Sequence, residues 1–163
     1  MVNDEFILLK NLHRTYQEAG LEHAVLKGIT LTIGRGETIA LLGRSGSGKS
    51  TLLNVISGID KLDQGRVIVN GVDLTVLPER ESTLFRRKNI GFVYQFFNLI
   101  PTLTAVENIA LVLELNGYSP SVVREKSRAM LTAVGLGQEA DRFPDRMSGG
   151  EQQRVAIARA LVH

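Results

Sequence analysis

The chain has 163 residues, of which 44% are hydrophobic and 22% charged, with a formal net charge of only +2. These totals are ordinary for a globular protein of one domain, and they argue against a polybasic nucleic-acid-binding surface. The lack of cysteine excludes disulfides and cysteine-ligated zinc, and no apolar run approaches the 18 residues of a membrane span. The first residues also lack the basic and then apolar order of a secretory signal.

The first part of the chain is rich in predicted strands. Residues 6–16 favour a strand, and residues 24–33 alternate Ile29, Leu31 and Ile33 with threonines, which is the period of a half-buried strand. A glycine turn at residues 34–36 then leads into residues 38–42, a short apolar run that predicts another strand.

A glycine-rich loop follows this run and precedes a predicted helix that begins near Lys49. Residues 43–50 match the pattern G-x-x-x-x-G-K-[ST] in full. We expect Gly43, Gly46 and Gly48 to take positive φ angles, so that backbone amides and the helix N-terminus can surround an anion. The sequence therefore predicts a nucleoside triphosphate site. Its residues are Gly43, Arg44, Ser45, Gly46, Ser47, Gly48, Lys49, Ser50 and Thr51.

Two side chains of this loop have predicted chemical roles. Lys49 should reach the β- and γ-phosphates, and the Ser50 hydroxyl should ligate Mg²⁺. The alternative is a Gly/Ser-rich turn that only leads into a helix. The complete pattern and the correct elements on both sides favour the phosphate site.

The middle of the chain predicts a hairpin, a helix and a short strand. Residues 66–69 run into Asn70-Gly71, a strong hairpin signal. Residues 78–87 favour a helix with Pro78 in its first turn. Residues 90–94 form an apolar run that ends at Gln95 and predicts a short strand.

The last part of the chain predicts three helices. Thr104 and Glu107 have the spacing of a capping box, which opens a helix that reaches about Leu115. That helix is apolar almost all round, so we expect it to be buried or to lie against a partner. A second helix starts at Ser119-Pro120 and ends near Gly135. A third covers residues 152–162, after a further capping-box spacing at Ser148 and Glu151.

The start of the last helix carries a family resemblance. Residues 147–154 read Met-Ser-Gly-Gly-Glu-Gln-Gln-Arg. Together with a phosphate loop about a hundred residues earlier, they resemble the signature motif of ATP-binding-cassette (ABC) ATPases. Met147 stands where Leu is usual, and Glu151 where Gln is usual. The resemblance covers essentially the whole chain, and residues 91–101 are most similar to the lipoprotein-releasing and macrolide-exporting branch.

This resemblance implies an α/β fold with a P-loop NTPase (RecA-like) core, an N-terminal antiparallel β part and an inserted α-helical subdomain. Residues 1–95 would form the β-rich part and the P-loop core. Residues 96–147 would form the helical subdomain, and residues 148–163 the signature motif and its helix.

The resemblance also implies further site residues. Tyr16 would stack on adenine, Gln95 would bind Mg²⁺ and act in catalysis with Lys49, and Ser148, Gly149 and Gly150 would close on the γ-phosphate held by the other subunit of a dimer. Each position has a plainer alternative. Tyr16 can be a strand-end aromatic that covers the core, Gln95 a polar loop residue, and Ser148 an ordinary N-cap.

The apolar loop at Phe96, Phe97, Leu99 and Ile100 has two interpretations. These side chains can pack under the helical subdomain. They can also line a groove for a membrane partner, as the resemblance implies, because large exposed apolar patches usually mark interfaces.

The 163 residues end before the strand that in this family carries the Walker B aspartate and the catalytic glutamate. We therefore expect a truncated cassette, with the C-terminal part of the cassette missing, that binds ATP weakly, hydrolyses little or none and has lowered stability.

The function implied is the ATP-binding subunit of an ABC transporter, with ATP and Mg²⁺ as cofactors. Its partners would be a transmembrane permease subunit and a second cassette, with no nucleic acid. It would be cytoplasmic, on the inner face of the cell membrane through the membrane partner. The alternative is a nucleotide-binding fragment without hydrolytic activity of its own. A DNA- or ribosome-acting relative is disfavoured, because the chain has no sustained heptads and cannot hold two cassettes.

Overall fold

The computed structural model describes residues 5–18 and 20–162. The chain divides into two compact units between Thr83 and Leu84, a point inside helix α2 (Glu79–Asn89). The division of the cassette at residue 96 that the resemblance implies remains a prediction.

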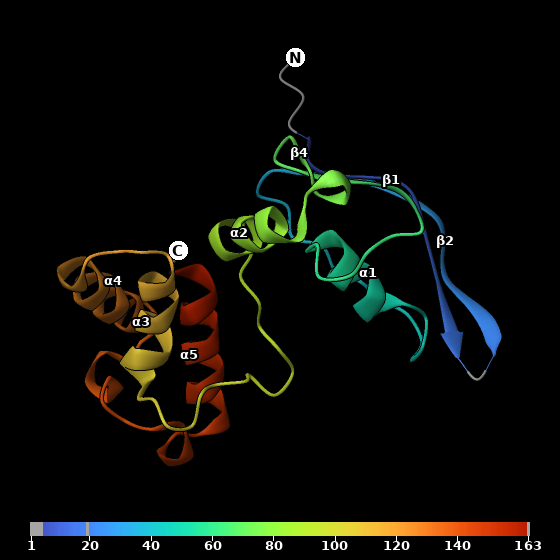
Figure 1. Cartoon of the computed structure of the whole chain (residues 1–163). Helices are drawn as coiled ribbons and strands as arrows, with labels where there is room; N and C mark the ends of the chain where they lie inside the picture. Colours follow the sequence, from blue (N-terminus) through green and yellow to red (C-terminus); the bar gives the residue numbers. More distant parts are fainter. Residues whose placement is uncertain (1–4, 19, 163) are drawn as a thin grey trace. The chain divides into compact units, whose positions relative to one another are not determined.

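The first unit is built on a four-stranded antiparallel sheet in the order β2-β1-β3-β4 (Figure 1). Its strands are β1 (Glu5–Glu18), β2 (Leu21–Gly34), β3 (Gln64–Val69) and β4 (Val72–Asp73). Asn70 and Gly71 both have positive φ angles, 49° and 78°, as a tight hairpin turn requires. The strands and the hairpin predicted from residues 6–16, 24–33 and 66–69 are confirmed.

Helix α1 (Lys49–Ile56) also contributes buried residues to this unit. Its Leu52 and Val55 are buried, and so are Leu9 and Leu12 of β1. Since α1 is only eight residues long, its stability comes from this burial rather than from helix propensity. The predicted helix after the glycine loop is confirmed.

The connection to the second unit begins with a 3₁₀ turn, η1 (Leu74–Val76), which Asp73 caps by accepting from Thr75 N at 3.0 Å. Pro78 precedes α2: its carbonyl accepts from Ser82 N at 2.9 Å. The helix expected here is confirmed, but Pro78 stands before its first turn instead of within it. Arg86, Arg87 and Lys88 occupy the last turn, where cations complement the helix dipole.

The second unit is helical (Figure 1). It contains α3 (Ala105–Leu115), α4 (Pro120–Ala133) and α5 (Gly149–Leu161), with 3₁₀ turns η2 (Gly137–Glu139) and η3 (Pro144–Arg146) before α5. Ile109, Leu113, Leu131 and Val155 are fully buried in its core. The three helices predicted from the sequence are confirmed, including both hydrogen bonds of the capping box at Thr104.

Two predicted strands are absent from the described residues. Residues 38–42 and 90–94 have no strand pairing, and Ile39 and Leu42 are 53% and 88% exposed. A strand of a parallel sheet needs hydrogen-bonded neighbours and cover on both faces. The described part of the chain gives neither segment such a neighbour, so the apolar pattern alone does not make a strand.

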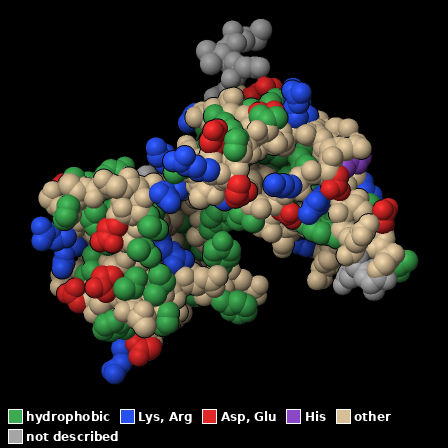
Figure 2. Space-filling view, viewed as in Figure 1, with side chains coloured by type: hydrophobic (Ala, Val, Ile, Leu, Met, Phe, Trp, Pro, Cys, Tyr) green, Lys and Arg blue, Asp and Glu red, His purple; other side chains and the backbone are tan. Residues whose placement is uncertain are grey.

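None of the helices in the described residues is both long and apolar enough to cross a membrane. On the face of the molecule that Figure 2 shows, Lys and Arg side chains are interspersed with Asp and Glu in both units. This mixed surface agrees with the small net charge of the sequence.

Replacing Leu131 by Ala tests the core of the second unit. Leu131 is fully buried, so we expect the free energy of unfolding to fall by about 2–5 kcal/mol, through lost apolar burial and the cavity left behind. Urea denaturation followed by circular dichroism measures this. The control Leu161→Ala, at a side chain that is 63% exposed, should change stability by about 0.5 kcal/mol or less. An equal loss in both variants would contradict the assigned core.

Candidate functional site

The glycine loop approaches β2 closely at the start of α1. Gly46 and Gly48 have φ angles of 77° and 86°, as predicted. A Cβ at Gly48 would lie 2.7 Å from Val25 Cγ1, so this position requires glycine for space as well as for conformation. Gly43 does not share the positive φ angle, contrary to expectation. Its constraint is steric, because a Cβ there would lie 2.7 Å from Ser47 Oγ.

Lys49 is the first residue of α1, and its ammonium group lies inside the loop. Its Nζ donates to the carbonyl oxygens of Gly43 at 2.9 Å and Arg44 at 2.7 Å, and lies 3.5 Å from Ser47 Oγ. The Lys49 ammonium group thus holds the loop in a closed conformation. Because the N-cap residue Gly48 has no side chain, the helix N-terminus has no side-chain cap, and its first amides remain available to a ligand.

A cavity of about 510 Å³ opens beside the loop in the first unit. Its lining brings Tyr16 of β1 together with residues of the loop. The lining residues are Tyr16, His23, Val25, Ser45, Gly46, Gly48, Lys49, Ser50 and Thr51. Sequence reasoning missed His23 and Val25. His23 could have been found from the strand register, because His23 of β2 pairs with Tyr16 of β1.

The Tyr16 ring is held from two sides by neighbouring charged groups. Its hydroxyl donates to Asp60 Oδ2, and the guanidinium carbon of Arg14 lies 4.6 Å from the ring centroid. Neither Arg14 nor Asp60 was predicted as part of the site. Their contact joins segments 46 residues apart, which no local pattern reveals.

Gln95 belongs to the second unit, where it lies exposed in a turn. The loop that follows it is anchored by Arg159 of α5, which donates to the carbonyl oxygens of Asn98 and Phe97, both at 2.7 Å. Burial lowers the pKa of Arg159. Phe97 and Asn98 have φ angles of 59° and 47°, and this strained backbone turns the two carbonyl oxygens toward one guanidinium.

The apolar residues of this loop divide between the two interpretations given by the sequence. Phe96 is 81% exposed, whereas Leu99 packs against the helical core of the second unit. The packing interpretation therefore holds for Leu99, whereas the exposed side chain of Phe96 is free to contact a partner.

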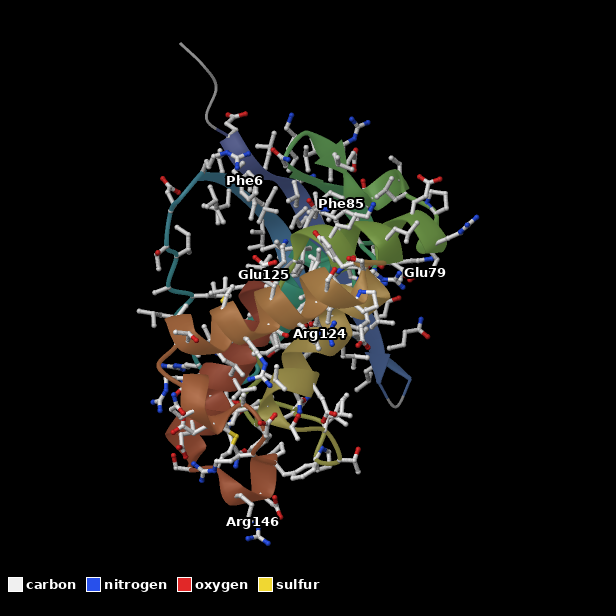
Figure 3. All side chains as sticks on the ribbon, turned by 90° about the vertical axis from the view of Figure 1, so that its left-hand side faces the viewer. Phe6, Glu79, Phe85, Arg124, Glu125 and Arg146 are labelled. Carbon is white, nitrogen blue, oxygen red and sulfur yellow. The ribbon has the colours of Figure 1, made fainter. Side chains whose placement is uncertain are left out.

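Ser148 caps α5. Its Oγ accepts from Glu151 N at 3.3 Å, and the Glu151 carboxylate accepts from Ser148 N at 2.6 Å. The Ser148 hydroxyl and the Ser148 N–H, with Arg142 3.2 Å away, lower the pKa of the Glu151 carboxyl. Arg146, labelled in Figure 3, is exposed on η3 just before this cap. The geometry is that of an N-cap, and Gly149 and Gly150 lie exposed in the first turn of α5.

The structure thus brings together the predicted residues of the first unit. Tyr16 and most of the glycine loop share one cavity. Gln95 and the signature residues 148–150 lie in the second unit, and their roles toward a nucleotide remain predictions.

Comparisons with known proteins agree on one family. A family model described as "ABC transporter" matches residues 26–163. An uncharacterized ABC transporter ATP-binding protein of Mycobacterium tuberculosis is 52% identical over 163 residues, which are 100% of this chain and 66% of that protein. The lipoprotein-releasing system ATP-binding protein LolD of Alcanivorax borkumensis is 46% identical over 153 residues, covering 94% of this chain and 67% of that protein.

Solved structures agree with this fold. The ATP-binding cassette MJ0796, in a dimeric post-hydrolysis state bound to ADP and Pi, superposes with a TM-score of 0.86 at 42% identity. The match covers 96% of this chain and 69% of the cassette. The fold is therefore the α/β P-loop fold of these cassettes, with its antiparallel β part and its helical part. The chain spans 66% of the length of the two mycobacterial relatives it matches. With a family model matched over most of its residues, the chain belongs to the ABC transporter family.

Proposed function

We propose that these residues form the ATP-binding part of the ATPase subunit of an ABC transporter. The observation that carries the proposal is the single cavity shared by the glycine loop, Lys49 and Tyr16. The loop amides and the N-terminus of α1 suit the phosphates, and Lys49 adds the charge that the β- and γ-phosphates require. Tyr16 offers an aromatic face for adenine, a contact worth about 1–3 kcal/mol.

The loop also suits Mg²⁺. Ser50 is exposed and lines the cavity, and a hydroxyl oxygen next to phosphate oxygens is a hard donor of the type Mg²⁺ prefers. When bound, the ion would neutralise charge on the phosphates. We propose Ser50 as one ligand and Gln95 as a second, with Gln95 acting alongside Lys49 in catalysis.

We further propose a second cassette and a membrane subunit as partners. The cassette MJ0796 is described as a dimer, and named relatives serve lipoprotein release and bacitracin export. In a dimer, Ser148, Gly149 and Gly150 would meet the γ-phosphate bound by the other subunit. The exposed Phe96 supports contact with a transmembrane permease, which would hold the protein on the inner face of the cell membrane.

Replacing Lys49 by Ala tests the phosphate site. We expect ATP to bind about tenfold more weakly or worse, because a charged hydrogen-bond donor to phosphate is lost. Calorimetric titration with Mg-ATP measures the Kd. Lys27→Ala is the control, since Lys27 is exposed on β2 and does not line the cavity. Equal affinity of Lys49→Ala and the parent chain would refute the proposed phosphate site.

The 163 residues alone should bind Mg-ATP without steady turnover. Hydrolysis needs a carboxylate that positions or deprotonates water, and no apolar run followed by Asp-Glu occurs after Ser148. Phosphate release from ATP should match the background of the Lys49→Ala variant. Turnover of this chain clearly above that background would show that another group supplies the base.

A further inference from the structure

A network of charged groups joins the end of β1 to the segment that follows α1, entirely within the first unit. Arg14 donates from Nη1 to Asp63 Oδ1 at 3.0 Å and from Nη2 to Asp60 Oδ1 at 3.1 Å. The N–H of Thr15 donates to Asp63 Oδ2 at 2.6 Å, and the hydroxyl of Tyr16 donates to Asp60 Oδ2. Both oxygens of each carboxylate therefore bond to β1.

The network restricts the Tyr16 ring in two ways. The hydroxyl is tied to Asp60, and the Arg14 guanidinium covers one face of the ring in a cation–π contact. The ring also lines the cavity beside the glycine loop. Since Arg14 occupies one face, a flat ligand in this cavity has the opposite face on which to stack.

The hydrogen bonds and opposite charges of the network favour the charged forms of Arg14 and Asp63. The pKa of Arg14 is raised, first by its contact with Tyr16 and then by Asp63 and Asp60. The pKa of Asp63 is lowered, first by the Thr15 N–H and then by Arg14. Arg14 and Asp60 are 22% and 23% exposed, so their pair is partly shielded from water.

Asp60 is also tied to the helix that begins at Lys49. Its backbone N–H donates to Asn54 O of α1 at 3.1 Å, and the N–H of Ile59 donates to the same oxygen at 2.9 Å. One end of α1 therefore presents Lys49 to the cavity, while the other end holds the carboxylate that binds the Tyr16 hydroxyl.

We propose that Asp60 is a positioning residue of the nucleotide site: it sets the orientation in which Tyr16 meets the base, and links that orientation to the phosphate-binding helix. This inference rests on the proposed function. Asp60 contacts Tyr16, not the nucleotide. Its loss should weaken binding of the base and leave binding of the phosphates unchanged.

The experiment separates base from phosphate by using two ligands. The Kd of Mg-ATP and that of magnesium tripolyphosphate, which has no base, are measured for the parent chain and for Asp60→Asn, Tyr16→Phe and Tyr16→Ala. We expect Asp60→Asn and Tyr16→Phe each to bind ATP about fivefold more weakly, because the stacking contact is no longer held in place. Tripolyphosphate affinity should stay within about twofold of the parent value.

Two controls make the result specific. Asp73→Asn changes a carboxylate with the same 23% exposure, in the same unit but outside the network, and should leave both affinities unchanged. In the Tyr16→Ala background, adding Asp60→Asn should cause no further loss of ATP affinity, because the ring that Asp60 orients is gone.

Three outcomes would overturn the inference. In the first, Asp60→Asn and Tyr16→Phe bind ATP as the parent chain does, while Tyr16→Ala binds it clearly more weakly. The proposed function would then stand, but Asp60 would have no positioning role. A loss of tripolyphosphate affinity in Asp60→Asn would mean that Asp60 supports the loop as a whole. If Lys49→Ala changed the affinity of neither ligand, the proposed function would fail, and this inference with it.

Discussion

The close contact between the start of α1 and β2 is the constraint on which the candidate site depends. Only a glycine at position 48 lets the backbone pass within reach of Val25, and the helix starts at the next residue. β2 in turn pairs with β1, where Tyr16 lies opposite His23. The glycine loop, with Lys49 after it, thus approaches one strand of this pair, and the Tyr16 ring lies on the other strand.

Arginine holds the irregular backbone beside the functional residues in both units. In the first, Arg14 bonds two carboxylates beyond α1 and covers Tyr16. In the second, Arg159 bonds two carbonyl oxygens just after Gln95. A planar guanidinium presents several donors in fixed directions, so one side chain can replace the backbone pairing that a loop lacks. These segments are therefore ordered without belonging to a helix or strand.

Local patterns in the sequence predicted most helices and strands, because caps, turn residues and apolar periods act over a few residues. The capping boxes at Thr104 and Ser148 and the turn at Asn70 are of this kind. The predictions of strands over residues 38–42 and 90–94 were wrong. Strand pairing depends on neighbouring strands, which these two segments lack among the described residues. The roles of Arg14 and Asp60 were not predicted for the same reason, because their contact depends on the tertiary packing of two segments that lie 46 residues apart in the sequence.

The unpaired state of residues 38–42 bears on how the phosphate loop keeps its shape. In the described structure no strand pairing fixes the segment before Gly43, yet the loop still closes, because Lys49 bonds the carbonyl oxygens of Gly43 and Arg44. The same ammonium group is the one proposed to bind the phosphates. A bound triphosphate must therefore compete with the loop's own carbonyl oxygens for Lys49. The charge of the phosphates favours the ligand in that competition, since the ammonium group is attracted to an anion by the opposite net charges as well as by the hydrogen bond, whereas the carbonyl oxygens are neutral.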